Sequence, residues 1–481
     1  MTLSTALNTA QAIFNNTSKQ TQVVSSNIAN GQNANYVRRS ASLTTAGNGA
    51  LVASVDRAQN NSLLRQTITA TSVSTGQSTL LTGLQEMRDL MGNNEYDNSP
   101  SRRLQNLFDQ LGSYAASPTS TTLGSTVVSN AQDLVDTLNN ISAGVQGIRT
   151  RADAEIQSQV DKLNGLLSQF EAANNQVVGA KITGSDANNA LDSRETILKQ
   201  ISSIVGVSTV VRDNGDMAIY TSEGTTLFET IPRTVSFNST NAYAANVTGN
   251  PIYIDGVAIT AGEGGDTSAS GSLQALLQIR DEIAPKFQSQ LDEVARTLIV
   301  SFAETGPSGA LPPLAGLFTN GVDDAVDATG TVIPGLAASI KVNPLAKGNP
   351  TMIRDGGFNG AAYVVNTGGS GYSKLLDSYT QAMKTTRSFD QATEVKGTLS
   401  LMTYSSASTS WLEAIRSTAT AANETKTAME ARASEAYTSE TGVSLDEELS
   451  LLLDIEQSYK AATKLVSTID EMMAALLQAA G

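Results

Sequence analysis

The 481-residue sequence predicts an α+β multidomain fold, with terminal coiled-coil helices, an elongated helical bundle and a β-rich domain inserted in the middle of the chain. Three observations predict it. Apolar residues recur every three or four positions at both ends of the chain, and the same spacing continues through long interior stretches. The centre is instead rich in Gly, Thr, Asn and Ser, with short alternating apolar runs that are typical of strands.

The first predicted helix covers residues 3–29 and ends at Asn30-Gly31, two residues that tolerate the left-handed conformation at a helix end. The only charges in the first 55 residues are Lys19, Arg38 and Arg39. A helix with so little charge can be buried on several sides at modest desolvation cost, which favours assembly with other helices. Its apolar face has the heptad rhythm of a coiled coil and consists of Leu3, Leu7, Ala10, Phe14, Val24 and Ile28.

The last predicted helix has the same rhythm. Ser444 and Glu447 have the spacing of a capping box, in which the Glu447 side chain reaches back to the Ser444 amide. The acids at 446–448 would suit a metal or a catalytic pair, but their place at the positive end of a helix dipole favours the capping role. The apolar face of this helix consists of Leu445, Leu449, Leu452, Ile455, Tyr459, Ala462, Val466, Ile469, Met473 and Leu476.

Two heptad helices at opposite ends of a chain are expected to pair. They either close one domain as an intramolecular coiled coil or become ordered when many copies assemble, since isolated helices of this length are marginal in water.

The interior divides into helical blocks around a strand-rich centre. Apolar spacing predicts helices over 56–178, with breaks near 92–101 and 117–121, and again over 271–303 and 372–437. Short strands are expected in 181–270, with hairpins at 207–220 around Asn214-Gly215 and at 251–259, and mostly loops in 304–371. The predicted domains are therefore 1–37 with 440–481, 38–180 with 371–439, and the insertion 181–370.

Composition excludes several classes of function. The chain has no cysteine and no histidine, so thiolate and imidazole metal sites and His-based catalytic triads are impossible. A net charge of −15 disfavours nucleic acid as a partner. No stretch is apolar enough to predict membrane insertion, and the first residues lack the basic and apolar regions of a cleaved signal peptide.

No catalytic or cofactor motif is convincing, and we predict neither enzymatic activity nor a cofactor. Gly262–Asp266 lacks the glycine spacing of a phosphate loop, and Asp213–Asp216 lacks the ligands of a calcium loop. Asp192 and Arg194 are expected to form an exposed helix pair or a cap. A pair of carboxylates for glycoside cleavage stays open, because their separation is spatial.

Motifs at both ends resemble one family. Asn27-Ile28-Ala29-Asn30 with Tyr36, and the stretch Gly442–Leu449, are similar to the terminal signatures of flagellar rod, hook and hook-associated axial proteins. Residues 31–36 depart from the Thr-x-Gly-Tyr turn that is usual there. The interior segments 186–195 and 272–282 resemble the hook-associated members.

The resemblance implies a structural adaptor at the hook–filament junction that self-assembles into a ring through its terminal helices. It implies as partners the hook protein, the second junction protein adjoining the filament, the type III export apparatus, and an export chaperone that binds the C-terminal helix face. The expected location is the extracellular flagellum, reached without a cleaved signal peptide. The alternatives are another axial subunit (hook, rod or second junction protein) or a chemoreceptor-like signalling bundle, which the strand-rich centre disfavours.

Overall fold

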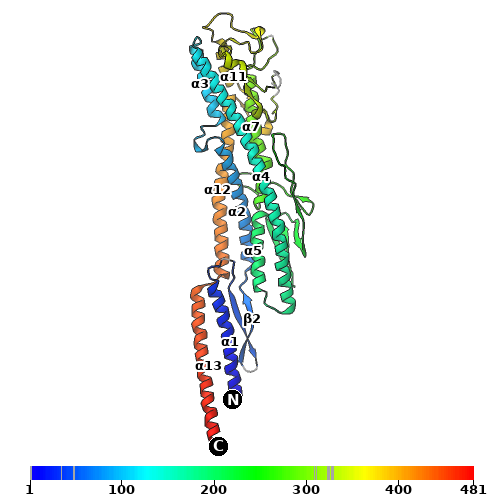
Figure 1. Cartoon of the computed structure of the whole chain (residues 1–481), viewed down its shortest axis with the longest axis vertical. Helices are drawn as coiled ribbons and strands as arrows, with labels where there is room; N and C mark the ends of the chain where they lie inside the picture. Colours follow the sequence, from blue (N-terminus) through cyan, green and yellow to red (C-terminus); the bar gives the residue numbers. More distant parts are fainter. Residues whose placement is uncertain are drawn as a thin grey trace. The chain divides into compact units, whose positions relative to one another are not determined.

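A computed structural model of the chain describes residues 3–33, 35–46, 49–307, 309, 311–321, 326 and 330–480 (Figure 1). The predicted α+β class is confirmed, since 63% of the chain is helical and small sheets lie in its middle. The chain forms two compact units. Unit 1 comprises 1–72, 163–234 and 426–481, and unit 2 comprises 73–162 and 235–425. The three-part division expected from the sequence stays a prediction.

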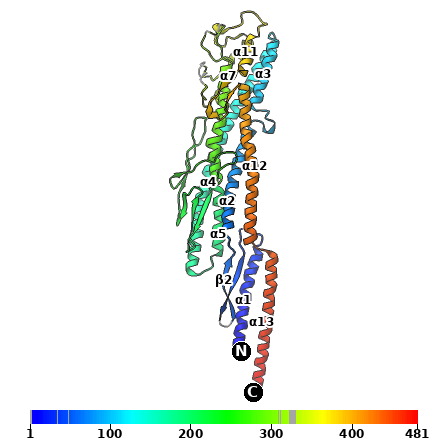
Figure 2. The ribbon, with the colours of Figure 1, turned by 180° about the vertical axis from the view of Figure 1, so that it is seen from behind.

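In unit 1 the two terminal helices lie side by side and antiparallel, as both views show (Figure 1, Figure 2). They are α1 (Leu3–Ala29) and α13 (Leu445–Ala480). The rings of Phe14 and Tyr459 meet edge to face, with centroids 5.1 Å apart. Buried residues recur every seven positions on each helix, which is the spacing of a coiled-coil seam. The seam residues are Ala10, Thr17 and Val24 on α1, and Glu448, Ile455, Ala462 and Ile469 on α13.

A β-hairpin follows α1 and packs against it. Strands β1 (Arg39–Ala46) and β2 (Gly49–Arg57) pair antiparallel, and the Val52 amide donates to Asn16 Oδ1 on α1 at 3.0 Å. The sequence prediction gave 38–180 to a helical bundle and was wrong here. The dipeptide Asn48-Gly49 between two Thr- and Val-containing runs was a usable hairpin signal.

The rest of unit 1 packs helix α5 (Asn188–Ile204) and the end of α4 (Thr121–Thr183) against a four-stranded sheet. The sequence analysis placed 181–270 in a strand-rich region, but residues 188–204 of that region form the helix α5. The predicted hairpin around Asn214-Gly215 is confirmed. The sheet has the order β3-β4-β5-β6, with strands Val207–Val211, Met217–Thr221, Thr226–Glu229 and Ile231–Pro232.

Unit 2 is mainly a helical bundle, and it includes residues 235–370, which the sequence analysis placed in the β-rich insertion. Ser99 caps α3 by accepting from the Arg102 amide, and Pro100 follows at the first helical position, which confirms the predicted break at 92–101. Leu104, Leu107 and Leu111 line the buried face of α3. Besides parts of α4, the bundle uses α2 (Asn61–Asp89), α3 (Pro100–Ala116), α7 (Ala284–Ser301), α11 (Lys374–Lys384) and α12 (Leu401–Thr441).

Shorter elements complete unit 2. The predicted helix over 271–303 is confirmed as α6 (Ser272–Leu277), the π-helical η2 (Gln278–Ile283) and α7, and the hairpin at 251–259 is confirmed as β8 (Tyr253–Ile254) and β9 (Val257–Ala258). Strand β7 (Val235–Ser236) adds to that hairpin. The remaining elements are η1 (Asn93–Glu95), β10 (Phe318–Thr319), α8 (Leu336–Ser339), β11 (Lys341–Val342), α9 (Pro344–Gly348), α10 (Met352–Asp355), η3 (Ala361–Tyr363), β12 (Arg387–Ser388), η4 (Gln391–Thr393) and β13 (Thr398–Leu399). Among the described helices, none has a stretch of the length and hydropathy needed to span a membrane.

Candidate assembly surface

The predicted apolar face of α13 divides into a covered and an uncovered part. Ile455, Ala462 and Ile469 are buried in the seam with α1. Leu452 and Val466 are half-buried. The apolar arc of α13 is thus wider than the single stripe that α1 covers. The predicted residues that stay exposed are Leu445, Leu449, Tyr459, Met473 and Leu476, although the Tyr459 ring also meets Phe14 of α1.

The predicted face of α1 is covered more completely. Ala10 and Val24 are buried, Phe14 and Ile28 are half-buried, and Leu7 is exposed. The side chain of Leu3 lies outside the described part of the chain. Sequence reasoning passed over Asn16, whose buried amide side chain joins α1 to the hairpin.

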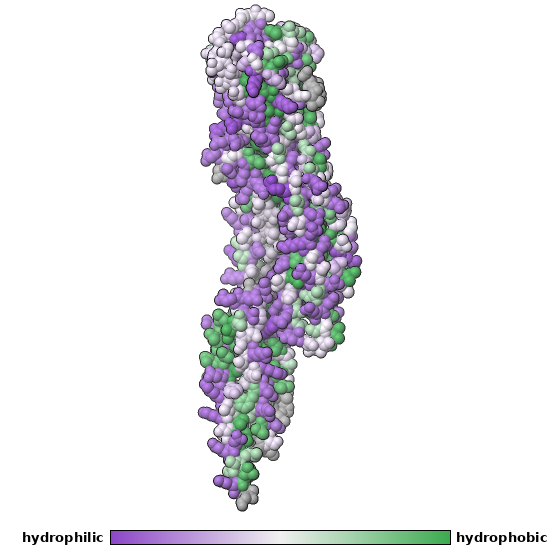
Figure 3. Space-filling model, viewed as in Figure 1, coloured by the Kyte–Doolittle hydropathy of each residue, from purple (hydrophilic) through white to green (hydrophobic). Residues whose placement is uncertain are grey.

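A second apolar flank of α13 was not predicted. Three exposed residues fall on one heptad position, each three residues after a seam residue: Leu451, Leu465 and Met472. Leu453 and Leu477 extend the apolar surface further around the helix. Hydrophobic surface gathers over the first turns of α13 (Figure 3). Exposed apolar surface of this kind marks a site of interaction with another protein.

The Asn27–Tyr36 motif fixes the turn from α1 into the hairpin. Asn27 is fully buried; its Oδ1 accepts from the Tyr36 hydroxyl at 2.9 Å and from the Arg39 amide at 3.1 Å. Its Nδ2 donates to the Arg39 carbonyl at 2.8 Å. Asn30 Nδ2 donates to the Ser26 carbonyl at 2.8 Å and so closes the last turn of the helix. The side chains of Ile28 and Ala29 are apolar and carry no hydrogen-bonding group. The motif is therefore a joint between two elements.

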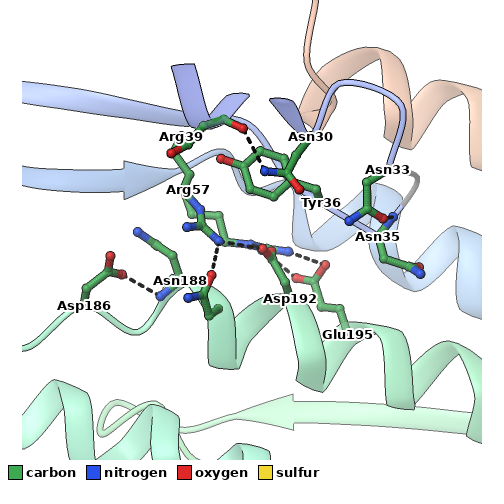
Figure 4. A network of polar contacts seen from close by, with 12 residues as sticks. Asn30, Asn33, Asn35, Tyr36, Arg39, Arg57, Asp186, Asn188, Asp192 and Glu195 are labelled. Atoms are coloured by element: carbon green, nitrogen blue, oxygen red, sulfur yellow. Dashed lines mark hydrogen bonds and ion pairs between the residues drawn. The ribbon is translucent and has the colours of Figure 1, made fainter. Parts of the chain in front are cut away.

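Beneath this joint lies a network of charges centred on Arg57 (Figure 4). Arg57 Nη1 and Nη2 donate to the two oxygens of Glu195 at 2.8 and 2.7 Å, and Nε donates to Asp192 Oδ1 at 2.6 Å. Arg39 Nη2 donates to the other oxygen of Asp192 at 2.9 Å. The Tyr437 hydroxyl donates to Glu195 Oε2 at 2.6 Å. The network thus ties the hairpin and α5 to the end of α12.

Burial and charge act in opposite directions on Arg57. Burial alone lowers its pKa, but hydrogen bonds and charge from Glu195 and Asp192 outweigh burial, and the net effect raises the pKa. Burial raises the pKa of the Tyr437 hydroxyl, and the charge of Glu195 adds to that rise. Burial lowers the pKa of Lys199, whose ammonium lies over the Tyr437 ring at 4.8 Å. The arrangement stabilises paired charges and offers no group poised for proton transfer.

The cap of α13 forms in part as expected. Ser444 Oγ accepts from the Glu447 amide at 3.4 Å, but the Glu447 carboxylate does not reach back to Ser444. It binds Arg38 Nη1 at 2.7 Å instead. Arg38 is also held through its amide, which donates to the Thr441 carbonyl at 2.9 Å. The Glu447 carboxylate binds Arg38 because a hydrogen bond to a charged guanidinium is stronger than one to the neutral Ser444 amide.

The expected exposed pairing of Asp192 with Arg194 was also wrong. Asp192 belongs to the Arg57 network, whereas Arg194 is buried and donates to Asn174 Oδ1 at 3.0 Å and to the Gly215 carbonyl at 2.7 Å. Burial lowers the pKa of Arg194 to about 10. Arg194 thus supports the predicted 212–216 turn from behind. Within the described ranges, acidic side chains form no group of three or more that would hold a metal ion.

Comparisons with known proteins agree with the interior and C-terminal motifs. Residues 84–310 match the family described as "Flagellar hook-associated protein FlgK helical domain", and residues 434–479 match "Flagellar basal body rod FlgEFG protein C-terminal". Flagellar hook-associated protein 1 of Salmonella typhimurium is 25% identical over 312 residues, covering 62% of this chain and 54% of the relative. The Bacillus subtilis protein of the same name is 24% identical over 237 residues, covering 45% and 47%.

A solved structure of the flagellar hook junction protein FlgK from Burkholderia pseudomallei is 22% identical, covers 53% of this chain and 46% of that one, and superposes with a TM-score of 0.42. The chain spans about half the length of the relatives it matches. The interior match to the hook-associated helical domain and the separate match of the C-terminal helix fall where the sequence motifs predicted them. The chain is thus similar to flagellar hook-associated proteins over its helical interior and to flagellar rod proteins at its C-terminal helix.

Proposed function

We propose that this chain is a structural subunit of the bacterial flagellum that acts as an adaptor at the hook–filament junction. The observation that carries the proposal is the uncovered apolar surface of α13, on a helix that also matches the C-terminal model of rod proteins. A single chain leaves Leu451, Leu465 and Met472 in water. Helices of neighbouring copies would cover them, since heptad spacing suits a second helix as partner.

In this proposal the terminal pair α1–α13 is the assembly element, and copies join into a ring. The predicted faces of both helices then have two roles: the seam residues hold the pair together, and the exposed residues of α13 contact neighbours. A contact between different surfaces of identical subunits propagates around a ring or along a helix. The hook protein would adjoin one face of the ring, and the second junction protein the other.

The remaining proposals follow from the similarity to flagellar hook-associated proteins. The chain leaves the cell through the flagellar type III export apparatus without a cleaved signal peptide, and becomes part of the extracellular flagellum. Before export, a chaperone binds the predicted apolar face of α13, including its exposed residues Leu449 and Leu476. The role of this chain is structural, and no catalytic step is assigned to the chain.

The test uses a strain that lacks the gene, complemented with variants. Leu451→Asp combined with Leu465→Asp places two carboxylates on the uncovered flank without touching the seam with α1. We expect the variant to fold, to be exported, and to fail to restore filaments. The matched control is Ser467→Asp, an exposed position on the same helix. Normal filaments with the double variant would contradict the proposal.

A further inference from the structure

Buried polar side chains in the terminal pair are hydrogen-bonded, with one exception among the described residues of α1 and α13. Asn16 Oδ1 accepts from the Val52 amide, and the Thr17 hydroxyl donates to the Ile13 carbonyl at 2.9 Å. Asn27 binds both backbone groups of Arg39. The exception is Glu448, whose Oε2 is buried and has no hydrogen-bond partner. An unsatisfied buried carboxylate oxygen in an otherwise satisfied interface calls for an explanation.

Glu448 occupies the first position of the α13 seam. It belongs to the same seven-residue series as Ile455, Ala462 and Ile469, and only 3% of its surface is exposed. The Phe14–Tyr459 contact places it nearly level with Val24 of α1. An apolar residue here would extend the seam by one layer. The carboxylate instead gives up water without a full set of hydrogen bonds, which is unfavourable for the paired state.

The nearby favourable interactions do not offset this. Glu448 lies in the first turn of α13, where the helix dipole attracts an acid, but that attraction is weak. Arg38, on the adjoining loop, is ion-paired with Glu447. Tyr36, whose pKa the charge of Glu448 helps to raise, donates its hydroxyl hydrogen bond to Asn27 Oδ1 and not to Glu448.

Glu448 is also not needed to set the register of the pair. A link of three residues, 442–444, joins α12 to α13. The Arg38 amide binds the Thr441 carbonyl at 2.9 Å, and the Asn27 joint fixes the other helix. These short connections already hold the two helices in one alignment.

We infer that Glu448 keeps the α1–α13 pair weaker than its seam would otherwise make it. The inference concerns the isolated chain and does not depend on its place in the flagellum. It predicts that removing the charge strengthens the pair, the reverse of the usual effect of substitution at a buried position.

Hydrogen exchange of the full chain, followed by mass spectrometry, tests this. We expect amides of α1 and α13 to exchange at least tenfold more slowly in Glu448→Leu, and more slowly to a smaller degree in Glu448→Gln. The matched control is Glu471→Leu, which replaces an exposed acid on the same helix and should leave exchange unchanged.

Unchanged or faster exchange in both Glu448 variants would overturn the inference. Slower exchange in Glu448→Leu together with unchanged exchange in Glu448→Gln would overturn it too, because the added stability would then come from apolar surface and not from removal of the charge. An equal gain in Glu471→Leu would overturn it as well, since the effect would not belong to the seam.

Discussion

Removing the Arg57 side chain is expected to destabilise unit 1 strongly. The side chain is 1% exposed and makes three hydrogen bonds to two carboxylates that are each 13% exposed. In Arg57→Ala, Glu195 keeps only the Tyr437 hydroxyl among these partners, and Asp192 keeps Arg39. Breaking one side of a buried ion pair costs about 3–5 kcal/mol, because the remaining charge is left uncompensated.

The lower half of that range applies, since both carboxylates keep one partner. For a cooperative unit of about 200 residues, a loss of about 3 kcal/mol lowers the melting temperature by roughly 6–12 °C. Circular dichroism follows the melting, and hydrogen exchange of α5 amides assigns the transition to unit 1. Arg57→Lys keeps the charge but not the paired geometry, so its melting temperature should lie between those of Arg57→Ala and the unaltered chain.

The control is Arg65→Ala, which removes an exposed arginine of unit 1 and should change the melting temperature little. An Arg57→Ala melting curve within about 2 °C of the unaltered chain, which corresponds to under about 1 kcal/mol, would refute the reasoning.

Three further predictions concern other buried groups. Asn27→Ala should destabilise unit 1 by about 2–3 kcal/mol in urea unfolding, because it strands the Arg39 amide and carbonyl, whereas Tyr36→Phe should cost only about 1 kcal/mol. Ala462→Arg should separate α1 from α13, seen as faster hydrogen exchange in both helices, because the seam has no room for the side chain. Burial raises the pKa of Asp292 to about 6 from 3.8, against hydrogen bonds from the Ala337 and Gly335 amides. The folded state thus binds this proton more tightly than the unfolded state, so unfolding free energy should fall by up to about 3 kcal/mol between pH 4 and 7, and the slope should be absent in Asp292→Asn.

Periodicity predicted the long helices well, because their apolar spacing is set by one geometry over many turns. The breaks around Pro100 and the hairpin at Asn214-Gly215 were also predictable, since proline and an Asn-Gly pair act locally. The hairpin over 39–57 was missed because its strands are rich in Ser and Ala, which are weak strand formers. Helix α5 was missed because its flanks resemble turns and its buried face includes Arg194.

The candidate assembly surface was likewise predictable from the sequence only in part. The heptad spacing predicted residues of the α13 seam. It could not show that α1 covers only one stripe of the wider apolar face of α13. The cap at Ser444 followed from spacing alone. The partner of Glu447 did not, because Arg38 lies 409 residues away in sequence. The Arg57 network had no signal in the sequence, since its members come from three distant segments that only folding brings together.

The most direct test of the account is to delete the gene in its own bacterium, then examine the cell surface by electron microscopy and the medium for filament protein. An adaptor at the hook–filament junction predicts cells with bare hooks and filament subunits released into the medium. Cells that keep normal filaments would contradict the account, and cells without hooks would place the chain earlier in the flagellar axis.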